Sequence, residues 1–299
     1  MTERSVQVVF ASPRALPKAD TVWGRVAVLD LAFVADELGV SFASTTRKFI
    51  RELGDRLAVW VDHHDHERHA EFLGDGRFVL AKKSEHGACP EMIDPALVAR
   101  VGAVDSIVCH LDLDGLYSAA KWLRGGVEPY EGADADARVV DTRVGTPGPL
   151  ADRIDRALRA HFRDDALKKT IVDFLVTGTR DAVLKAQIDG AAADFDEMEH
   201  ETKRLSTLFE LRGAGQVAFV DAHTHARRAF DKTELLLAGQ KLAKVAVVRH
   251  AGHITLAAAF DSGVDFLRLL SLSGGMPTRV TLPEKHLPDI LRRLTEAGL

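Results

Sequence analysis

Three side chains that can bind a divalent cation recur at every second position along one short segment. His110, Asp112 and Asp114 follow the apolar residues 107–109 and precede Gly115. In an extended chain alternate side chains point to the same side, so the imidazole and both carboxylates can converge on one point. Converging carboxylates repel each other unless a cation neutralises them, and one imidazole with several carboxylates suits an ion such as Mn²⁺. The alternative interpretation is a solvated Asp-x-Asp-Gly turn.

A second group of candidate ligands follows another apolar segment. Asp62, His63 and His64 come directly after residues 58–61, which are typical of a buried strand. If the strand continues, the two adjacent imidazoles point to opposite sides, so one could bind a metal and the other could reach a substrate. The alternative is a His-rich surface loop that extends through residues 65–69.

These motifs resemble those of the DHH phosphoesterase superfamily. The triplet Asp62-His63-His64 resembles the one that defines the superfamily, and residues 110–115 resemble its His-x-Asp-x-Asp-Gly motif. Asp30, after an apolar segment, resembles a third motif, a lone Asp at a strand end, and its alternative role is a helix N-cap. The family places the His-x-Asp-x-Asp motif first, whereas here it comes last. This departure predicts a circular permutation of the catalytic domain, which can preserve the site.

The resemblance implies a pair of Mn²⁺ ions, with Mg²⁺ or Co²⁺ as alternatives, and hydrolysis by a hydroxide held between them. The implied metal ligands are Asp30, which would bridge, with His63, His110, Asp112, Asp114 and Asp141. For Asp141, a helix N-cap is an equal alternative. Asp62 would orient His63, and His64 would donate a hydrogen bond or a proton to the phosphoryl or leaving-group oxygen.

Strands and helical segments alternate through the first two thirds of the chain. The expected strands include residues 5–11, 24–33, 76–81 and 138–143, and the expected helices include residues 45–53 and 95–101. Such alternation predicts an α/β fold with a parallel sheet, and ligands bind beyond the carboxyl ends of parallel strands. We therefore expect a DHH-type catalytic domain over residues 1–190.

The remaining residues are expected to form a connector and a smaller domain. Residues 191–212 belong to a long amphipathic helical stretch, and residues 213–299 resemble the α/β DHHA1 domain that follows many DHH domains. The glycine-rich motif of that domain survives in part, but Met276 occupies the position of its His. The implied substrate-binding residues are Arg143, Gly274, Gly275 and Arg279. Arg143 could equally be a surface charge.

Composition limits the classes of partner. With 46% hydrophobic and 28% charged residues, the chain is ordinary for a globular protein, and its net charge of −5 argues against long duplex nucleic acid as a partner. No apolar run reaches the roughly 18–20 residues of a membrane span, and no signal peptide is evident. The two cysteines, Cys89 and Cys109, make no disulfide framework, so we expect a cytoplasmic protein.

Three functions remain open from the sequence. The first is hydrolysis of phosphodiester bonds in short oligonucleotides or in linear or cyclic dinucleotides, with a small nucleotide or short single strand as partner. The second is hydrolysis of a phosphoanhydride such as pyrophosphate or polyphosphate. The third is a non-catalytic, nucleotide-binding regulatory module, which the carboxylate cluster argues against because such a cluster costs stability without metal. A homodimer is one assembly that the chain could form.

Overall fold

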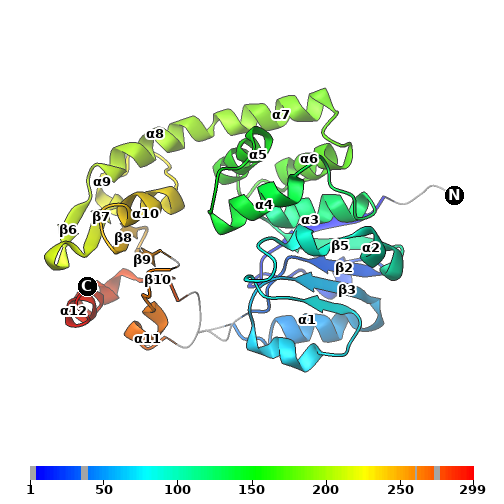
Figure 1. Cartoon of the computed structure of the whole chain (residues 1–299), viewed down its shortest axis with the longest axis horizontal. Helices are drawn as coiled ribbons and strands as arrows, with labels where there is room; N and C mark the ends of the chain where they lie inside the picture. Colours follow the sequence, from blue (N-terminus) through cyan, green and yellow to red (C-terminus); the bar gives the residue numbers. More distant parts are fainter. Residues whose placement is uncertain (1–4, 35–39, 260, 273–276) are drawn as a thin grey trace. The chain divides into compact units, whose positions relative to one another are not determined.

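The computed structural model describes residues 5–34, 40–259, 261–272 and 277–299 of the chain. The chain forms two compact units, Met1–Ala193 and Asp194–Leu299 (Figure 1). The boundary lies inside the stretch 191–212, and the expected division into a catalytic domain, a connector and an accessory domain remains a prediction. None of the helices among the described residues combines the length and the apolar character needed to cross a membrane.

The first unit is built on a parallel sheet with the strand order β1-β5-β2-β3-β4. Its strands are β1 (Gln7–Ala11), β2 (Val26–Leu29), β3 (Leu57–Asp62), β4 (Phe78–Leu80) and β5 (Ser106–His110). The predicted parallel α/β fold is confirmed, although several strands are shorter than expected. Because β5, β2 and β3 are neighbours in the sheet, the three sequence motifs leave it side by side at their carboxyl ends.

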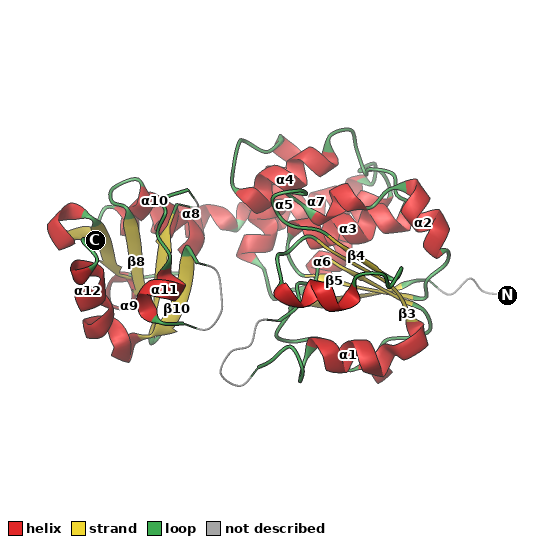
Figure 2. Ribbon diagram, turned by 60° about the horizontal axis from the view of Figure 1, so that its bottom comes forward, coloured by secondary structure: helices red, strands yellow, loops and turns green. Residues whose placement is uncertain are grey.

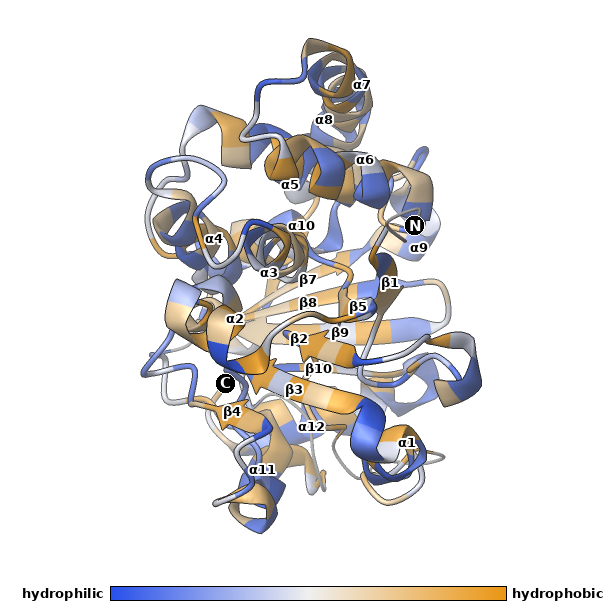
Figure 3. Ribbon diagram, turned by 90° about the vertical axis from the view of Figure 1, so that its right-hand side faces the viewer, coloured by the Kyte–Doolittle hydropathy of each residue, from blue (hydrophilic) through white to orange (hydrophobic). Residues whose placement is uncertain are grey.

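Helices cover both faces of this sheet (Figure 2). Within β2, Ala27 and Leu29 pack with the core on one face, whereas Val26 and Val28 pack with the core on the other. Burial on both faces explains why the central strands β2 and β3 are apolar up to the acidic residue at the end of β3, as the hydropathy colouring in Figure 3 shows. The helices are α1 (Thr46–Leu53), α2 (Pro95–Val101), α3 (Leu113–Leu123), α4 (Ala133–Thr142), α5 (Pro149–Ala160), α6 (Asp165–Val176) and α7 (Ala182–Ala193). Short 3₁₀ turns are η1 (Ala19–Thr21), η2 (Gly54–Arg56), η3 (Glu67–Phe72) and η4 (Cys89–Met92).

One predicted strand is wrong. Residues 138–143 were expected to form a strand with Asp141 at its end, but they belong to the last turns of α4 and its C-cap. The β-branched pair Val139-Val140 favours a strand locally, yet Ala133, Ala137 and Val140 are buried at helical spacing. Packing of this helical face outweighs the local preference.

The second unit is a smaller α/β unit, as predicted for the end of the chain. Its sheet has the order β10-β9-β8-β7-β6, in which only the pair β7–β8 is parallel among the described residues. The strands are β6 (Glu210–Arg212), β7 (Val217–Asp221), β8 (Val245–His250), β9 (His253–Ala258) and β10 (Arg279–Pro283). The helices are α8 (Phe195–Ser206), α9 (Ala222–His225), α10 (Lys232–Gln240), α11 (Phe266–Leu270) and α12 (Leu287–Glu296), with 3₁₀ turns η5 (Gly213–Gly215) and η6 (Glu284–His286).

Candidate metal centre

The three sequence motifs meet where β2, β3 and β5 end. Asp30 follows β2, His63 follows β3 and His110 is the last residue of β5. The Asp30 side chain is fully buried, and its backbone NH donates to the Val61 carbonyl at 2.8 Å. Its φ of +58° lies in the left-handed region, which is uncommon for residues other than glycine. Such strain is typical of residues that surrounding structure holds in place for a functional reason.

The N-terminus of α3 supplies the next two carboxylates. Asp112 is the N-cap, and its Oδ1 accepts a hydrogen bond from the Gly115 backbone NH at 3.4 Å. Asp114 lies in the first turn and is buried, with Oδ2 accepting from the Cys89 backbone NH at 3.4 Å. The positive end of the helix dipole favours carboxylates here, and it holds both of them beside the strand ends.

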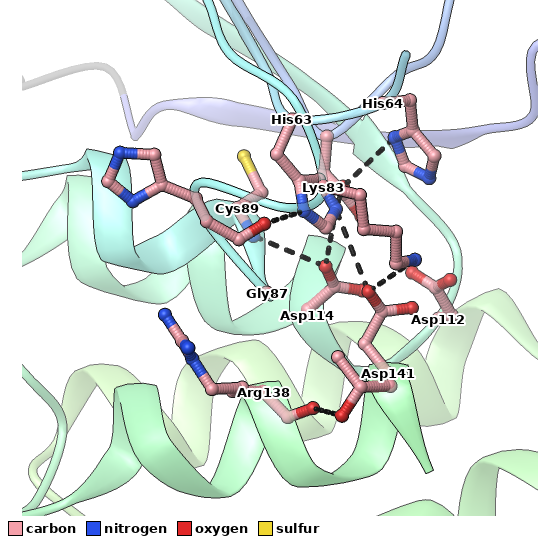
Figure 4. A network of polar contacts seen from close by, with 12 residues as sticks. His63, His64, Lys83, Gly87, Cys89, Asp112, Asp114, Arg138 and Asp141 are labelled. Atoms are coloured by element: carbon pink, nitrogen blue, oxygen red, sulfur yellow. Dashed lines mark hydrogen bonds and ion pairs between the residues drawn. The ribbon is translucent and has the colours of Figure 1, made fainter. Parts of the chain in front are cut away.

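His63 presents one ring nitrogen to a set of carboxylates (Figure 4). Its Nδ1 lies 2.9 Å from the His86 carbonyl oxygen, which can only accept, so Nδ1 carries a proton and Nε2 faces the cluster. The distances from Nε2 are 3.3 Å to Asp30 Oδ1, 3.4 Å to Asp114 Oδ2 and 3.7 Å to Asp141 Oδ2. The imidazole is therefore oriented by backbone and aimed at three carboxylates.

His110 forms a second group on the other side of Asp30. Its Nδ1 lies 2.7 Å from Asp112 Oδ2 and 3.7 Å from Asp30 Oδ2. Asp30 thus directs Oδ1 toward His63 and Oδ2 toward His110. A carboxylate with one oxygen in each group is placed to be shared by two cations.

Several buried polar atoms at this point have no hydrogen-bond partner among the described residues. They are both carboxylate oxygens of Asp30 and Nε2 of His63. Buried polar atoms without partners are rare and costly in folded proteins. Those atoms belong to three overlapping groups in which the ligand atoms lie within 4.8 Å of one another, namely Asp30–His63–His64, Asp30–His110–Asp112 and His63–Asp114–Asp141. This donor set of oxygens with a few imidazole nitrogens fits divalent cations such as Mn²⁺.

The crowded carboxylates change the protonation of their neighbours. Burial lowers the pKa of His63, but the close carboxylates of Asp114 and Asp30 outweigh burial and raise that pKa to about 11. Burial and the charge of Asp112 raise the pKa of Asp114. Burial opposes the rise at His110 too, yet Asp112 raises its pKa well above the ordinary value. Protons on these groups offset the repulsion that a bound cation would remove.

Asp62 does not orient His63, and this prediction is wrong. Its Oδ1 accepts a hydrogen bond from Nδ1 of His64 at 2.8 Å, and its Oδ2 lies 3.8 Å from Nε2 of His69. The chain bends at His64, after β3 ends at Asp62. The expectation that His63 and His64 point to opposite sides is also wrong, because their ring centroids are 4.5 Å apart and both rings approach Asp30 Oδ1. Asp62 therefore positions His64, whose side chain is 31% exposed and whose pKa is raised by Asp62 against the opposing effect of burial.

The sequence reasoning missed Lys83. This residue follows β4, and its Nζ lies 2.6 Å from Asp141 Oδ2, the oxygen that also faces His63 (Figure 4). Lys83 belongs to no recognised motif. The signal in the sequence is a basic residue shortly after an apolar strand, β4, which pairs with the strand that ends at Asp62. The same loop supplies the His86 carbonyl that orients His63.

Of the predicted substrate-binding residues, the structure describes Arg143 and Arg279. Arg143, the C-cap of α4, pairs with Asp155 at 3.1 Å. Arg279 begins β10 in the second unit and donates to Thr233 Oγ1 at 3.2 Å. Gly274, Gly275 and the neighbouring Met276 lie outside the described residues. The role of these residues in binding substrate remains a prediction.

Comparison with known proteins gives matches among solved structures. No protein-family model matches the chain, and no curated protein matches it in sequence. A structure of the exonuclease RecJ bound to manganese aligns with 91% of this chain and 75% of its own, at 13% identity and a TM-score of 0.50. A pGpG-specific phosphodiesterase, PggH from Vibrio cholerae, aligns with 92% of this chain and 99% of its own, at 9% identity and a TM-score of 0.46. An exopolyphosphatase-related protein from Bacteroides fragilis aligns with 99% of this chain and 94% of its own, at 12% identity and a TM-score of 0.44.

Proposed function

We propose that this chain, which shares the fold of RecJ, is a metal-dependent phosphoesterase that binds two divalent cations, with Mn²⁺ as the preferred ion. Its proposed reaction is hydrolysis of phosphodiester bonds in short oligonucleotides or in linear or cyclic dinucleotides. The observation that carries the proposal is the set of candidate ligand atoms that converge from the ends of three neighbouring strands. The DHH-type motifs are the second support, because they supply the residues of that set.

The proposed ligands form two groups that share Asp30. The first group consists of Asp30, His63, Asp114 and Asp141, and the second of Asp30, His110 and Asp112. When bound, two such cations activate water as a nucleophile at neutral pH and stabilise the charge that develops on the phosphoryl oxygens. The His86 carbonyl keeps the Nε2 lone pair of His63 directed at its group.

The chain's own residues position the substrate and its proton. Asp62 accepts from Nδ1 of His64 and so leaves Nε2 of that ring for the substrate. The proposed role of His64 is to donate a hydrogen bond to a phosphoryl oxygen and to protonate the leaving oxygen. Residues 213–299 remain the proposed substrate-binding domain, with Arg279, Gly274 and Gly275 as its candidate residues.

The test is a parallel assay of four substrates with Mn²⁺ and with chelator. The substrates are bis-p-nitrophenyl phosphate, a short single-stranded RNA, cyclic dinucleotides and pyrophosphate. We expect Mn²⁺-dependent turnover of a phosphodiester that chelator abolishes, and loss of that turnover in Asp30→Asn but not in the exposed control Asp20→Asn. Turnover of pyrophosphate alone would reject the phosphodiesterase in favour of a phosphoanhydride hydrolase. Nucleotide binding without any turnover would favour the regulatory module.

A further inference from the structure

Lys83 places a fixed positive charge at the edge of the candidate metal centre. Its Nζ contacts Asp141 Oδ2 at 2.6 Å, and the same oxygen lies 3.7 Å from Nε2 of His63 (Figure 4). The carboxylate of Asp141 thus lies between the ammonium group of Lys83 and the proposed metal ligand His63. A lysine side chain ordinarily carries a positive charge at neutral pH.

The charges at the centre indicate that the Lys83 ammonium does more than neutralise a carboxylate. Asp30, Asp112, Asp114 and Asp141 contribute four negative charges, and two divalent cations would cancel them. With both cations bound, the Lys83 ammonium is a further positive charge beside the centre. A positive charge beside a site attracts an anionic substrate.

The side chain of Lys83 is partly exposed. The Lys83 side chain is 35% exposed, whereas that of Asp141 is 16% exposed and that of Asp30 is fully buried. Of these three side chains, that of Lys83 is therefore the most open to solvent. An ammonium group has three N–H donors, and the ion pair with Asp141 uses one of them. The others can donate to an oxygen that enters from solvent.

We propose that Lys83 binds a non-bridging phosphoryl oxygen of the substrate and selects for an anionic phosphorus centre. This inference rests on the proposed phosphoesterase function and adds a substrate-binding residue that no motif marks. Asp141 acts as the positioning residue of Lys83, because it holds the ammonium beside the metal ligands. The competing account is that Lys83 only holds Asp141 in place for a cation.

The test compares Lys83→Met and Lys83→Arg with the control Lys82→Met, whose lysine is the exposed neighbour. Calorimetry first gives the Mn²⁺ affinity, and then the affinity for inorganic phosphate at saturating Mn²⁺. We expect Lys83→Met to weaken phosphate binding by about 10- to 100-fold, the effect of a lost hydrogen bond between charged groups. Lys83→Arg keeps the charge and should lose less, and Lys82→Met should match the wild type.

Two results would overturn the inference. One is phosphate binding by Lys83→Met as tight as in the wild type. The other is a weaker Mn²⁺ affinity with unchanged phosphate affinity once Mn²⁺ is saturating, which is what the competing account predicts. Phosphate binding requires no turnover, so this comparison holds even if the wild type hydrolyses no phosphodiester. A lack of hydrolysis would reject the proposed function and would leave the binding result for Lys83 intact. If Lys83→Met does not fold, Lys83→Gln takes its place, with the same expected loss and the same two contradicting results.

Discussion

Replacing Gly115 by alanine tests whether α3 must approach the end of β5 as closely as it does. A Cβ atom at this position would lie 2.4 Å from the carbonyl oxygen of His110 and 2.7 Å from its carbonyl carbon. Real Cβ atoms almost never come within 3.0 Å of an atom from a residue that is not their chain neighbour. Helix and strand must therefore separate by at least 0.6 Å, the difference between 3.0 and 2.4 Å. The obstacle is backbone, which cannot swing aside as a flexible side chain can.

The expected cost follows from two opposing effects. Overpacking a buried site costs about 1–3 kcal/mol, and the higher helix propensity of alanine returns up to about 1 kcal/mol. We therefore expect Gly115→Ala to lower the free energy of unfolding by about 1–2 kcal/mol. Because the displaced helix carries Asp112 and Asp114, Mn²⁺ affinity should also fall about 10- to 100-fold, as when groups that orient metal ligands are lost.

A second helical glycine provides the matched control. Gly190 in α7 is exposed, and a Cβ there would have no atom within 4 Å. Gly190→Ala should raise the free energy of unfolding by about 0.5–1 kcal/mol and leave Mn²⁺ affinity unchanged. Denaturant unfolding and calorimetry measure both quantities in both variants. If Gly115→Ala proves as stabilising as Gly190→Ala, or binds Mn²⁺ like the wild type, the reasoning about the contact with His110 is refuted.

Three further predictions concern the charged groups of the centre. Asp30→Asn should abolish the stabilisation by Mn²⁺ while the protein still folds, since asparagine tolerates the left-handed backbone; an undiminished Mn²⁺ response would contradict this. Asp62→Asn should lower kcat by about 10²- to 10⁴-fold while Mn²⁺ binding persists, because it acts through His64; loss of metal binding would instead mark Asp62 as a ligand. In chelator, the raised pKa of His63 contributes stability fully below pH 6.5 and loses it as pH rises toward 11, so the midpoint should fall between pH 7 and pH 10; a flat profile in wild-type protein would refute it.

The ends of the apolar segments predicted where the candidate ligands lie. Asp30, His63 and His110 each follow a run of apolar residues, and the carboxyl ends of parallel strands meet at one edge of a sheet. That rule places residues on a shared edge without reference to tertiary detail. The structure brings these three side chains together, and their role as metal ligands remains a prediction to be tested.

Side-chain partners and helix faces were less accessible from the sequence. Asp62 contacts His64 and not His63 because the chain bends at His64 just beyond β3, and a strand pattern does not predict such a bend. Asp141 reaches the cluster from a helix, because burial of one face of α4 outweighs the strand preference of its valines. The place of Lys83 at the centre becomes evident only when two distant segments pack together. Its partner Asp141 is 58 positions further along the chain, from 83 to 141.

The central claim is that two divalent cations share the carboxylate of Asp30 at the ends of β2, β3 and β5. Anomalous diffraction near the manganese edge, from crystals grown with Mn²⁺, tests it most directly. The account predicts two manganese peaks, one in contact with His63 and Asp114, the other in contact with His110 and Asp112, with Asp30 touching both. Absence of manganese from this cluster, or a single ion that leaves Asp30 unbound, would contradict it.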